Sequence, residues 1–276
     1  MDSIFSQNVG QLEIIAVDNG STDGTAALIS KNYPQVILIQ NKINAGAAAA
    51  RNQGIRAAKG GWIFSLDCDT VLEKDFFHNL KNALKILTPE IGMVQPKILQ
   101  AGKKAVYSAG IFRSCLRKFY DIGKGQKDSG QFNQSGRVFG ACSAAAIYKK
   151  EMLDQVKEES GYFDERLFFL FEDADLSWRA QNKGWLALFY PDAVCYHCGN
   201  SSATPEKTRQ YLCLRNRYFT LLKNEALKRY ILAFIFYDLP RLAYILITNP
   251  RALRAVKEAL AFKAHSGRAK ITTHEK

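Results

Sequence analysis

Short apolar runs alternate with stretches of helical spacing along the first ninety residues of the chain. Each apolar run is five or six residues long, as buried strands often are. We expect strands at Leu12–Val17, Val36–Gln40 and Trp62–Leu66, and helices that begin at Ser21 and cover Ala45–Lys59 and Asp75–Leu87. This alternation predicts an α/β fold with a mostly parallel central sheet and helices on both faces.

The pattern is looser between residues 90 and 200. We expect strands at Gly92–Leu99, Val106–Phe112 and Val138–Ile147, a helix from Phe171 to Lys183, and short strands at Trp185–Tyr190 and Ala193–His197. The stretch Asp121–Gly136 is rich in Gly, Lys, Gln and Ser, which predicts a loop. Ligands bind at the carboxyl ends of parallel strands, so the polar residues that follow each strand are the first candidates for a site.

A second apolar segment, Tyr230–Thr248, lies near the end of the chain and is interrupted by Asp238, Pro240 and Arg241. Each uninterrupted part is too short to cross a bilayer. A charge near the centre of a spanning helix costs about 2.5–3.5 kcal/mol, and proline breaks or kinks a helix. The sequence therefore favours a helical hairpin or a segment lying in the membrane plane over a spanning helix.

The net charge of +12 is distributed unevenly over the 276 residues. Residues 203–276 carry 15 Lys and Arg against 5 Asp and Glu, whereas residues 1–202 carry 23 against 21. We therefore expect a nearly neutral domain over 1–202 and a basic, partly apolar helical extension over 203–276. Basic residues beside an apolar segment favour an anionic membrane surface as partner. No nucleic-acid motif accompanies the charge, which argues against a nucleic-acid partner.

The six cysteines are scattered, and no N-terminal apolar stretch has the layout of a signal peptide. Both features predict a protein of the reducing cytoplasm. Cys195, His197 and Cys198 lie close together in sequence, but they lack a second ligand pair and so make a poor zinc site.

Asp67-Cys68-Asp69 is the strongest local signal in the sequence. Two carboxylates at the end of a strand can converge on one Mg²⁺ or Mn²⁺ ion and leave coordination positions for substrate phosphates. The alternative is that these aspartates cap the helix that follows. Their position directly after an expected strand keeps both interpretations open.

Glu172-Asp173 is the second signal and follows an aromatic run. Acidic residues at a helix start are favoured by the helix dipole, which is a sufficient structural reason for the pair. The functional alternative is a carboxylate general base whose basicity is tuned by burial. His197 follows a short strand and is either a metal ligand or a core imidazole.

Five blocks in order carry a resemblance to the family 2 glycosyltransferases. They resemble the family segments "EIIVVDNGSTDGT", "N-x-G-x-x-x-A-R-N-x-G", D-x-D, "G-x-F-D-E…F-x-E-D-x-D-L-x-x-R" and "P-x-A-x-x-x-H". The blocks of this chain are Glu13–Thr25, Asn44–Gly54, Asp67–Asp69, Gly161–Arg179 and Pro191–His197. The most similar subgroup is the rhamnosyltransferase-like members, which build bacterial surface polysaccharides.

The resemblance implies a GT-A fold and the transfer of a sugar from a nucleotide-diphospho-sugar to an acceptor hydroxyl, with inversion. The acceptor it implies is a saccharide or a lipid-linked saccharide at the inner face of the cell membrane. It implies that Asp173 is the base and that Glu172 shapes its surroundings. It implies that Asp69 and His197 hold the Mg²⁺ or Mn²⁺ ion.

The resemblance also implies donor-binding residues. Asp18 would hold the base or ribose, Asp67 the ribose and the metal–diphosphate, and Arg215 and Arg217 the diphosphate. Asn44, Gly46 and Arg51 would line the nucleotide site, and the region around Trp178 would contact the acceptor.

The chain departs from the family pattern at its start. The family segment resembling "S-V-I-I-P-x-Y-N" has no counterpart, and Met1–Gln7 resembles only the end of the first helix. We therefore expect the strands beside that position to lack a ladder partner. The alternative to an enzyme is a degenerate protein that binds nucleotide-sugars without catalysis or acts as a scaffold.

Overall fold

The structure is a computed structural model that describes residues 1–7, 10, 12–199, 204–249 and 252–269. The chain forms two compact units. Unit 1 comprises residues 1–112, 119–168 and 172–201, and unit 2 comprises residues 113–118, 169–171 and 202–276. Two short segments from the first 200 residues thus belong to unit 2. The domain boundary expected at residue 202 does not account for them.

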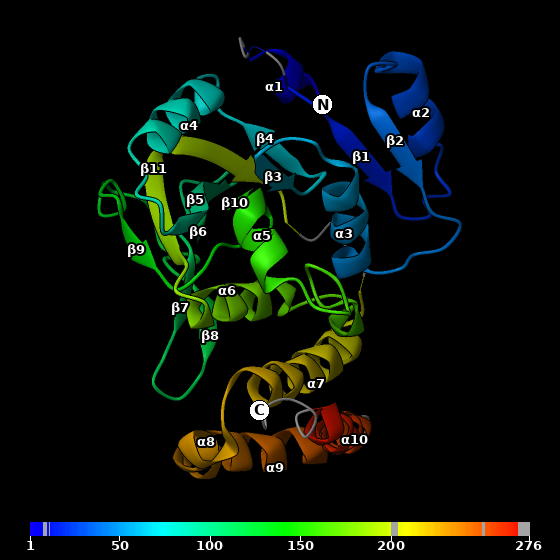
Figure 1. Ribbon diagram of the computed structural model, residues 1–276, viewed down its shortest axis with the longest axis vertical. Coiled ribbons are helices and arrows are strands. Elements are labelled where there is room, and N and C mark those ends of the chain that lie inside the picture. Colours follow the sequence, from blue (N-terminus) through cyan, green and yellow to red (C-terminus); the bar gives the residue numbers. More distant parts are fainter. Residues whose placement is uncertain (8–9, 11, 200–203, 250–251, 270–276) are drawn as a thin grey trace, which may run out of the picture. The chain divides into compact units, whose positions relative to one another are not determined.

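Unit 1 contains a two-stranded sheet near its start and a seven-stranded sheet (Figure 1). Strands β1 (Ile15–Asp18) and β2 (Ile37–Gln40) form a parallel pair that is joined by helix α2 (Thr25–Asn32). The second sheet has the order β3-β10-β5-β11-β4, with β6 beside β5 and β9 beside β11. Its strands are β3 (Trp62–Leu66), β4 (Thr70–Leu72), β5 (Ile91–Gln100), β6 (Val106–Ser108), β9 (Gly136–Val138), β10 (Ala145–Lys149) and β11 (Leu186–His197).

The pairing corrects the expectation of a mostly parallel sheet. In the second sheet the β5–β11 pair is parallel, whereas β10 runs antiparallel to both β3 and β5, and β11 runs antiparallel to β4 and β9. Among the described residues, β1 pairs with β2 only and β3 with β10 only, so no ladder joins the two sheets. From the resemblance to the family 2 glycosyltransferases, the segment that has no counterpart in this sequence is expected to form a further strand at this place.

Alternating side chains of the central strands face two different hydrophobic cores. Met93 and Tyr148 contribute to one core, and their neighbours Val94 and Ile147 contribute to the other. This period of two follows from the pleat of a strand. Helices cover both faces (Figure 1): α4 (Phe76–Lys85) packs in one core, and α3 (Ala47–Ala57), α5 (Lys150–Val156) and α6 (Glu172–Asn182) in the other.

Two expected elements have different boundaries in the structure. The expected strand Val106–Phe112 is divided into β6 and β7 (Ile111–Arg113), because Gly110 between them has a φ of 111°. β7 pairs with β8 (Phe119–Asp121). The two expected strands around Pro191 are one strand, β11, whose register shifts between Tyr190 and Val194. The proline is tolerated at that irregular point, where the ladder is interrupted.

Unit 2 contains the helices α7 (Glu206–Asn224), α8 (Leu227–Ala233), α9 (Leu239–Thr248) and α10 (Ala252–Ala269). A π-helical stretch, Phe234–Asp238, connects α8 to α9 without a break. The expected hairpin is therefore absent from this part of the chain. Pro240 directly follows the π-helical stretch, where the regular i→i−4 hydrogen bonding is already interrupted. Arg229–Thr248 is long and apolar enough to cross a membrane, and only 11% of it is buried.

Candidate functional site

The site residues of unit 1 lie at the carboxyl ends of its strands. β3, β5 and β11 run in the same direction, because β10 is antiparallel to β3 and β5 while β11 is parallel to β5. Asp67 follows the last residue of β3, and His197 is the last residue of β11. Both side chains are therefore presented at one edge of the sheet, where ligands bind in α/β proteins.

Asp67, Asp69 and His197 form a cluster at this edge. Their potential ligand atoms all lie within 4.8 Å of one another. His197 Nε2 is 3.0 Å from Asp69 Oδ1 and 3.7 Å from Asp67 Oδ2. Backbone pairing fixes this arrangement, because His197 is opposite Thr70 and the Cys198 N–H donates to the Asp69 carbonyl. The sequence placed these three residues correctly at strand ends.

The cluster suits a hard divalent cation. Asp69 Oδ2 and His197 Nδ1 are buried and have no hydrogen-bond partner among the described residues, and the buried Asp69 Oδ1 has His197 Nε2 beside it at 3.0 Å. A buried carboxylate without a donor is costly unless a cation compensates its charge. Two carboxylates and one imidazole are also a donor set that Mg²⁺ or Mn²⁺ accepts. These residues therefore fit a divalent metal ion.

Arg51 of α3 connects the cluster to the start of α6. Its guanidinium donates to Asp67 Oδ1 at 2.8 Å and to Glu172 Oε1 at 2.7 Å. Burial raises the pKa of the Asp67 carboxyl, but His197 and Arg51 outweigh this effect, so the pKa lies below its usual value. Asp67 is thus held ionised, as a metal or ribose ligand requires.

Asp173 is a half-buried carboxylate with little compensation of its charge. Burial, followed by the negative charges of Glu172 and Asp121, raises the pKa of Asp173 to about 7. Its oxygens accept hydrogen bonds from Ser143 N–H at 3.3 Å and Ala174 N–H at 2.8 Å. A carboxylate with a pKa near neutrality suits a general base.

A short backbone segment connects the base to the metal cluster. The Ser143 N–H donates to Asp173, and the carbonyl of the next residue, Ala144, accepts the Asp67 N–H at 2.9 Å. The Ser143 hydroxyl lies 2.9 Å from the Tyr148 hydroxyl, which fixes this segment from the sheet side. The two halves of the candidate site are therefore held by adjacent residues.

Hydrogen bonds of asparagine side chains connect the loop after β1 to the loop after β2. Asn19 donates to Asn44 Oδ1 at 3.0 Å and to the Gly46 carbonyl, and Asn44 accepts the Gly46 N–H at 2.9 Å. Asp18 is buried at the end of β1 and accepts the Ser21 N–H. Gly46 has a φ of 88°, and a Cβ there would lie 2.6 Å from the Phe168 ring. Asn44 and Gly46 thus shape this loop pair, a role that Asn19 shares although the sequence did not single it out.

Three further residues near the cluster were missed in the sequence. The Tyr107 ring packs on His197 with centroids 4.3 Å apart, and Lys124 Nζ lies 4.8 Å from the centre of the Tyr107 ring. Lys124 is paired with Asp121 at 2.9 Å. Lys124 belongs to a stretch that was expected to be a loop, and only the fold shows that it lies beside the cluster.

Three expected site residues have other roles in this structure. Trp178 is only 3% exposed and packs against Phe119 and Phe139, so it does not present its ring to an acceptor. Arg217 is 1% exposed and is paired with Asp238 at 2.7 Å. Arg215 is bound within unit 2 to Asn216, Tyr211 and Glu258. These contacts differ from the substrate contacts expected for the three side chains.

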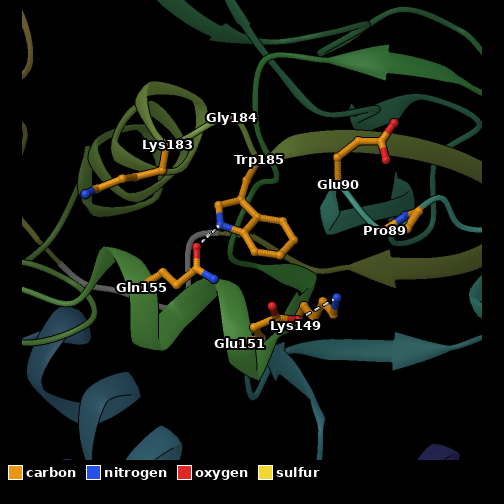
Figure 2. A pocket seen from close by; sticks show the side chains of 8 residues that line it. All are labelled: Pro89, Glu90, Lys149, Glu151, Gln155, Lys183, Gly184 and Trp185. Atoms are coloured by element: carbon orange, nitrogen blue, oxygen red, sulfur yellow. Dashed lines mark hydrogen bonds and ion pairs between the residues drawn. The ribbon is translucent and has the colours of Figure 1, made fainter.

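A hollow of about 530 Å³ lies elsewhere in unit 1 (Figure 2). Trp185 and Glu90 immediately precede β11 and β5, and Lys149 is opposite the first residue of β3. The hollow is therefore at the amino ends of these strands, away from Asp67 and His197. It is lined by Pro89, Glu90, Lys149, Glu151, Gln155, Lys183, Gly184 and Trp185. This lining has two carboxylates, Glu90 and Glu151, but no histidine, and it includes two lysines.

Comparison with known proteins identifies the family to which the sequence belongs. Residues 1–157 match the family model described as Glycosyl transferase family 2. The poly-beta-1,6-N-acetyl-D-glucosamine synthase of Staphylococcus epidermidis is 27% identical over 206 residues, which cover 71% of this chain and 45% of that protein. The synthase of the same name from Staphylococcus aureus strain COL is 26% identical over 204 residues, with the same coverage. The chain thus spans less than half of the length of these relatives.

Solved structures agree with the architecture. The crystal structure of S. aureus TarS has a TM-score of 0.60 at 16% identity and covers 95% of this chain and 45% of that one. The crystal structure of GalNAc-T7 with UDP, GalNAc and Mn²⁺ has a TM-score of 0.55 at 15% identity, covering 75% of this chain and 41% of that one. At these identities the likeness shows the fold, a GT-A arrangement with a central sheet flanked by helices.

Proposed function

The chain belongs to glycosyl transferase family 2, and we propose that it transfers a sugar from a nucleotide-diphospho-sugar to a hydroxyl group of an acceptor. One observation carries the proposal. A carboxylate–imidazole cluster suited to a divalent cation and a half-buried carboxylate with a pKa of about 7 are held by adjacent backbone residues, Ala144 and Ser143. Sugar transfer needs both functions side by side.

The reaction is a direct displacement with inversion. Asp173 takes the proton of the acceptor hydroxyl while the hydroxyl oxygen attacks the anomeric carbon. The bond between that carbon and the diphosphate oxygen breaks, and its electron pair leaves with the nucleoside diphosphate. The Ser143 and Ala174 N–H groups hold the Asp173 carboxylate in place during the transfer. A pKa of about 7 makes Asp173 basic enough for this step yet ionised at slightly alkaline pH.

Asp67, Asp69 and His197 hold a Mg²⁺ or Mn²⁺ ion in this proposal. Such an ion neutralises negative charge that develops on the departing diphosphate. Arg51 keeps the Asp67 carboxylate oriented and ionised. Lys124 lies beside Tyr107, whose ring packs on His197. More than half of the Lys124 side chain is exposed, so it can turn from Asp121 toward the diphosphate. Asp18 and the loop formed by Asn44 and Gly46 bind the nucleoside.

The biological setting follows from the resemblance and the tail. We propose that the chain belongs to the rhamnosyltransferase-like subgroup, and that its acceptor is a saccharide or lipid-linked saccharide of a bacterial surface polysaccharide. The protein works at the cytoplasmic face of the membrane, where the basic, apolar tail meets anionic lipid. The synthases to which it is similar are named for a polysaccharide product, which supports this setting.

The test is a panel of UDP-, dTDP- and GDP-sugars with the full chain, first by thermal shift and then by release of nucleoside diphosphate with Mg²⁺ or Mn²⁺. We expect turnover of one donor, loss with EDTA, and recovery with the metal. Asp69→Asn should abolish metal-dependent turnover, whereas Asp192→Asn, an exposed carboxylate in β11, should not. Donor binding without turnover under all metal conditions would favour the non-catalytic alternative.

A further inference from the structure

We propose that the helical run from Leu227 to Thr248 lies flat on an anionic bilayer, with one defined face in the lipid and the other held by α7. This rests on the proposed function only in its choice of a membrane as partner. The orientation and the residues in contact with lipid come from unit 2 alone.

Exposed residues recur in pairs every four positions along this run. The outer stripe consists of Ile231, Leu232, Ile235, Phe236, Leu239 and Ile247, whose exposed fractions range from 46% to 82%. Tyr244, 68% exposed, lies on the same face and has the amphipathic ring that is favoured at a membrane surface. No charged residue occurs among these exposed positions between 231 and 248. A contiguous exposed apolar face of this kind marks an interaction surface.

Asp238, the carboxylate in the middle of the run, faces inward instead. Asp238 and Asn249 are buried, and Tyr230 donates a hydrogen bond to Asp238. A helix on the surface of a water-soluble protein has the opposite arrangement, with apolar residues inside and polar residues in solvent. The inverted pattern fits a helix whose outer face is solvated by hydrocarbon.

Two sets of contacts hold the run along α7. Near its middle, Asp238 accepts hydrogen bonds from Arg217 at 2.7 and 3.0 Å. Just past its end, Asn249 donates to the Lys207 carbonyl and to Gln210, both at 3.3 Å. Arg217 is in the second half of α7 and Lys207 in its first turn, so the run lies antiparallel along α7.

These contacts exclude a spanning orientation of the folded unit. α7 would have to enter the bilayer beside the run, together with the charged side chains of Arg209, Arg215 and Lys223. Each buried charge in hydrocarbon is strongly unfavourable. Breaking the Arg217–Asp238 pair instead would leave two buried charges without an opposite charge beside them. Lying in the plane requires neither.

The charges around the run identify the lipid. Arg229 is exposed at its start, and α10 exposes Arg254 and Lys257 next to the apolar residues Leu253 and Leu260. The chain from residue 203 onward carries 15 Lys and Arg against 5 Asp and Glu. Apolar contact combined with positive charge is the pattern of an interfacial helix on anionic head groups.

Tryptophan depth measurement on the full chain tests the orientation. Leu232→Trp, Leu239→Trp and Ile247→Trp place a reporter near the start, middle and end of the outer stripe. Each is bound to phosphatidylglycerol–phosphatidylcholine vesicles whose acyl chains are brominated at shallow or deep positions, and emission is read as the difference from the wild-type protein. We expect all three to be quenched most by shallow bromines. Ile86→Trp, an exposed apolar position of unit 1, is the control and should not be quenched.

A spanning helix would overturn the proposal by showing deep quenching at Leu239→Trp and shallow quenching at the other two. Absence of quenching would overturn it as well, above all if light scattering shows a dimer that Ile235→Glu dissociates, because the stripe would then bind a second copy.

Affinity gives a second readout. Leu232→Glu with Phe236→Glu should weaken vesicle binding by at least about tenfold, since two apolar side chains leave the lipid. Raising salt from 0.1 to 0.5 M should weaken binding to vesicles that contain phosphatidylglycerol. Release of nucleoside diphosphate is measured on the same samples. Turnover without docking would refute this inference alone, and docking without turnover would refute the proposed function alone.

Discussion

At the scale of single residues, the site consists of carboxylates in unequal surroundings. Asp67 lies beside His197 and Arg51, which hold its pKa below the usual value, whereas Asp173 is half-buried beside Glu172 and has a pKa of about 7. Such a separation assigns different work to chemically identical groups. Asp67 serves as an ionised ligand, and Asp173 can gain and lose a proton near neutral pH.

Asp173→Asn should lower kcat by roughly 10²–10⁴-fold, because the acceptor proton then has no base. Donor binding by thermal shift should change little. In the wild-type protein the ionised form is active, so kcat/KM should rise with pH and level off above about pH 7. The pH profile of nucleoside diphosphate release measures this. A flat profile between pH 5.5 and 8.5 would contradict the assignment of the base.

Glu172→Gln tests the assignment of the base through a shift of the pH profile and not through a loss of activity. The negative charge of Glu172 raises the pKa of Asp173, so its removal should lower that pKa. The acid limb of the pH profile should therefore move to lower pH, even if the maximal rate falls because Arg51 loses a partner. An acid limb that stays in place would mean that Glu172 acts only through position.

Lys124→Met should reduce kcat by about tenfold or more, since a mobile cation beside the diphosphate stabilises its developing charge. Lys127→Met is the matched control, being an exposed lysine of the same loop. Steady-state kinetics with the donor identified in the panel distinguishes the two variants. Equal effects in both would show that the loop supplies charge only in a general way.

At this scale the motif residues could be predicted from the sequence, whereas the residues that pack beside them, Tyr107 and Lys124, could not. Asp67, Asp69 and His197 lie at strand ends that the local pattern shows, so their meeting could be expected. Tyr107 and Lys124 come from β6 and a loop, and only the β5–β6 pairing and the turn after β8 bring them near His197. No periodicity in the sequence specifies such a tertiary contact.

At the scale of elements, hydrophobic runs predicted where strands lie better than how they pair. Trp62–Leu66 is a strand with the expected bounds, yet its partner β10 is antiparallel. A buried antiparallel strand such as Ala145–Lys149 has the same apolar composition as a parallel one, so direction cannot be read from it. Asp175 and Arg179, which lie in the block Gly161–Arg179, form a buried ion pair at 2.9 Å within α6.

Asn52 connects α3 to the segment before α6 and should be sensitive to change. Its amide exchanges two hydrogen bonds of 2.8 Å with the backbone of Phe163 and donates another to Glu165. Asn52→Ala leaves the buried Phe163 groups unpaired and should cost about 3 kcal/mol of unfolding free energy. Urea unfolding measures this. Arg56→Ala, an exposed change on the same helix, should stay within about 0.5 kcal/mol.

At the scale of the whole molecule, unit 2 contains the residues that directly precede the base. Residues 169–171 belong to unit 2 and continue into Glu172 and Asp173 of α6. Phe168, Leu170 and Phe171 have φ values of 63°, 71° and 71°, which are strained for side chains of this size. Division of the chain by charge and hydropathy could not find this link, because the segment is short and its conformation leaves no compositional trace.

Asn216 of α7 holds this strained segment and should therefore affect the chemical step. It is fully buried, and its amide donates to the Phe169 and Leu170 carbonyls at 2.8 and 2.7 Å. Asn216→Ala removes both bonds, so the strained conformation is no longer imposed and Asp173 loses its fixed position. We expect kcat to fall about tenfold, with donor KM within about twofold, since a misplaced base slows the step without weakening donor binding.

A purely structural role for Asn216 would lower the amount of folded enzyme and leave its kcat and pH profile unchanged. Active-site titration with tight-binding nucleotide therefore has to accompany the kinetics. Arg209→Ala, an exposed change on the same helix, is the control and should leave both parameters unchanged. Vesicle binding should survive in Asn216→Ala, because the outer stripe and the Arg217–Asp238 pair remain. Retained docking with reduced kcat would show that Asn216 affects the chemical step through residues 169–171 and not through the membrane run.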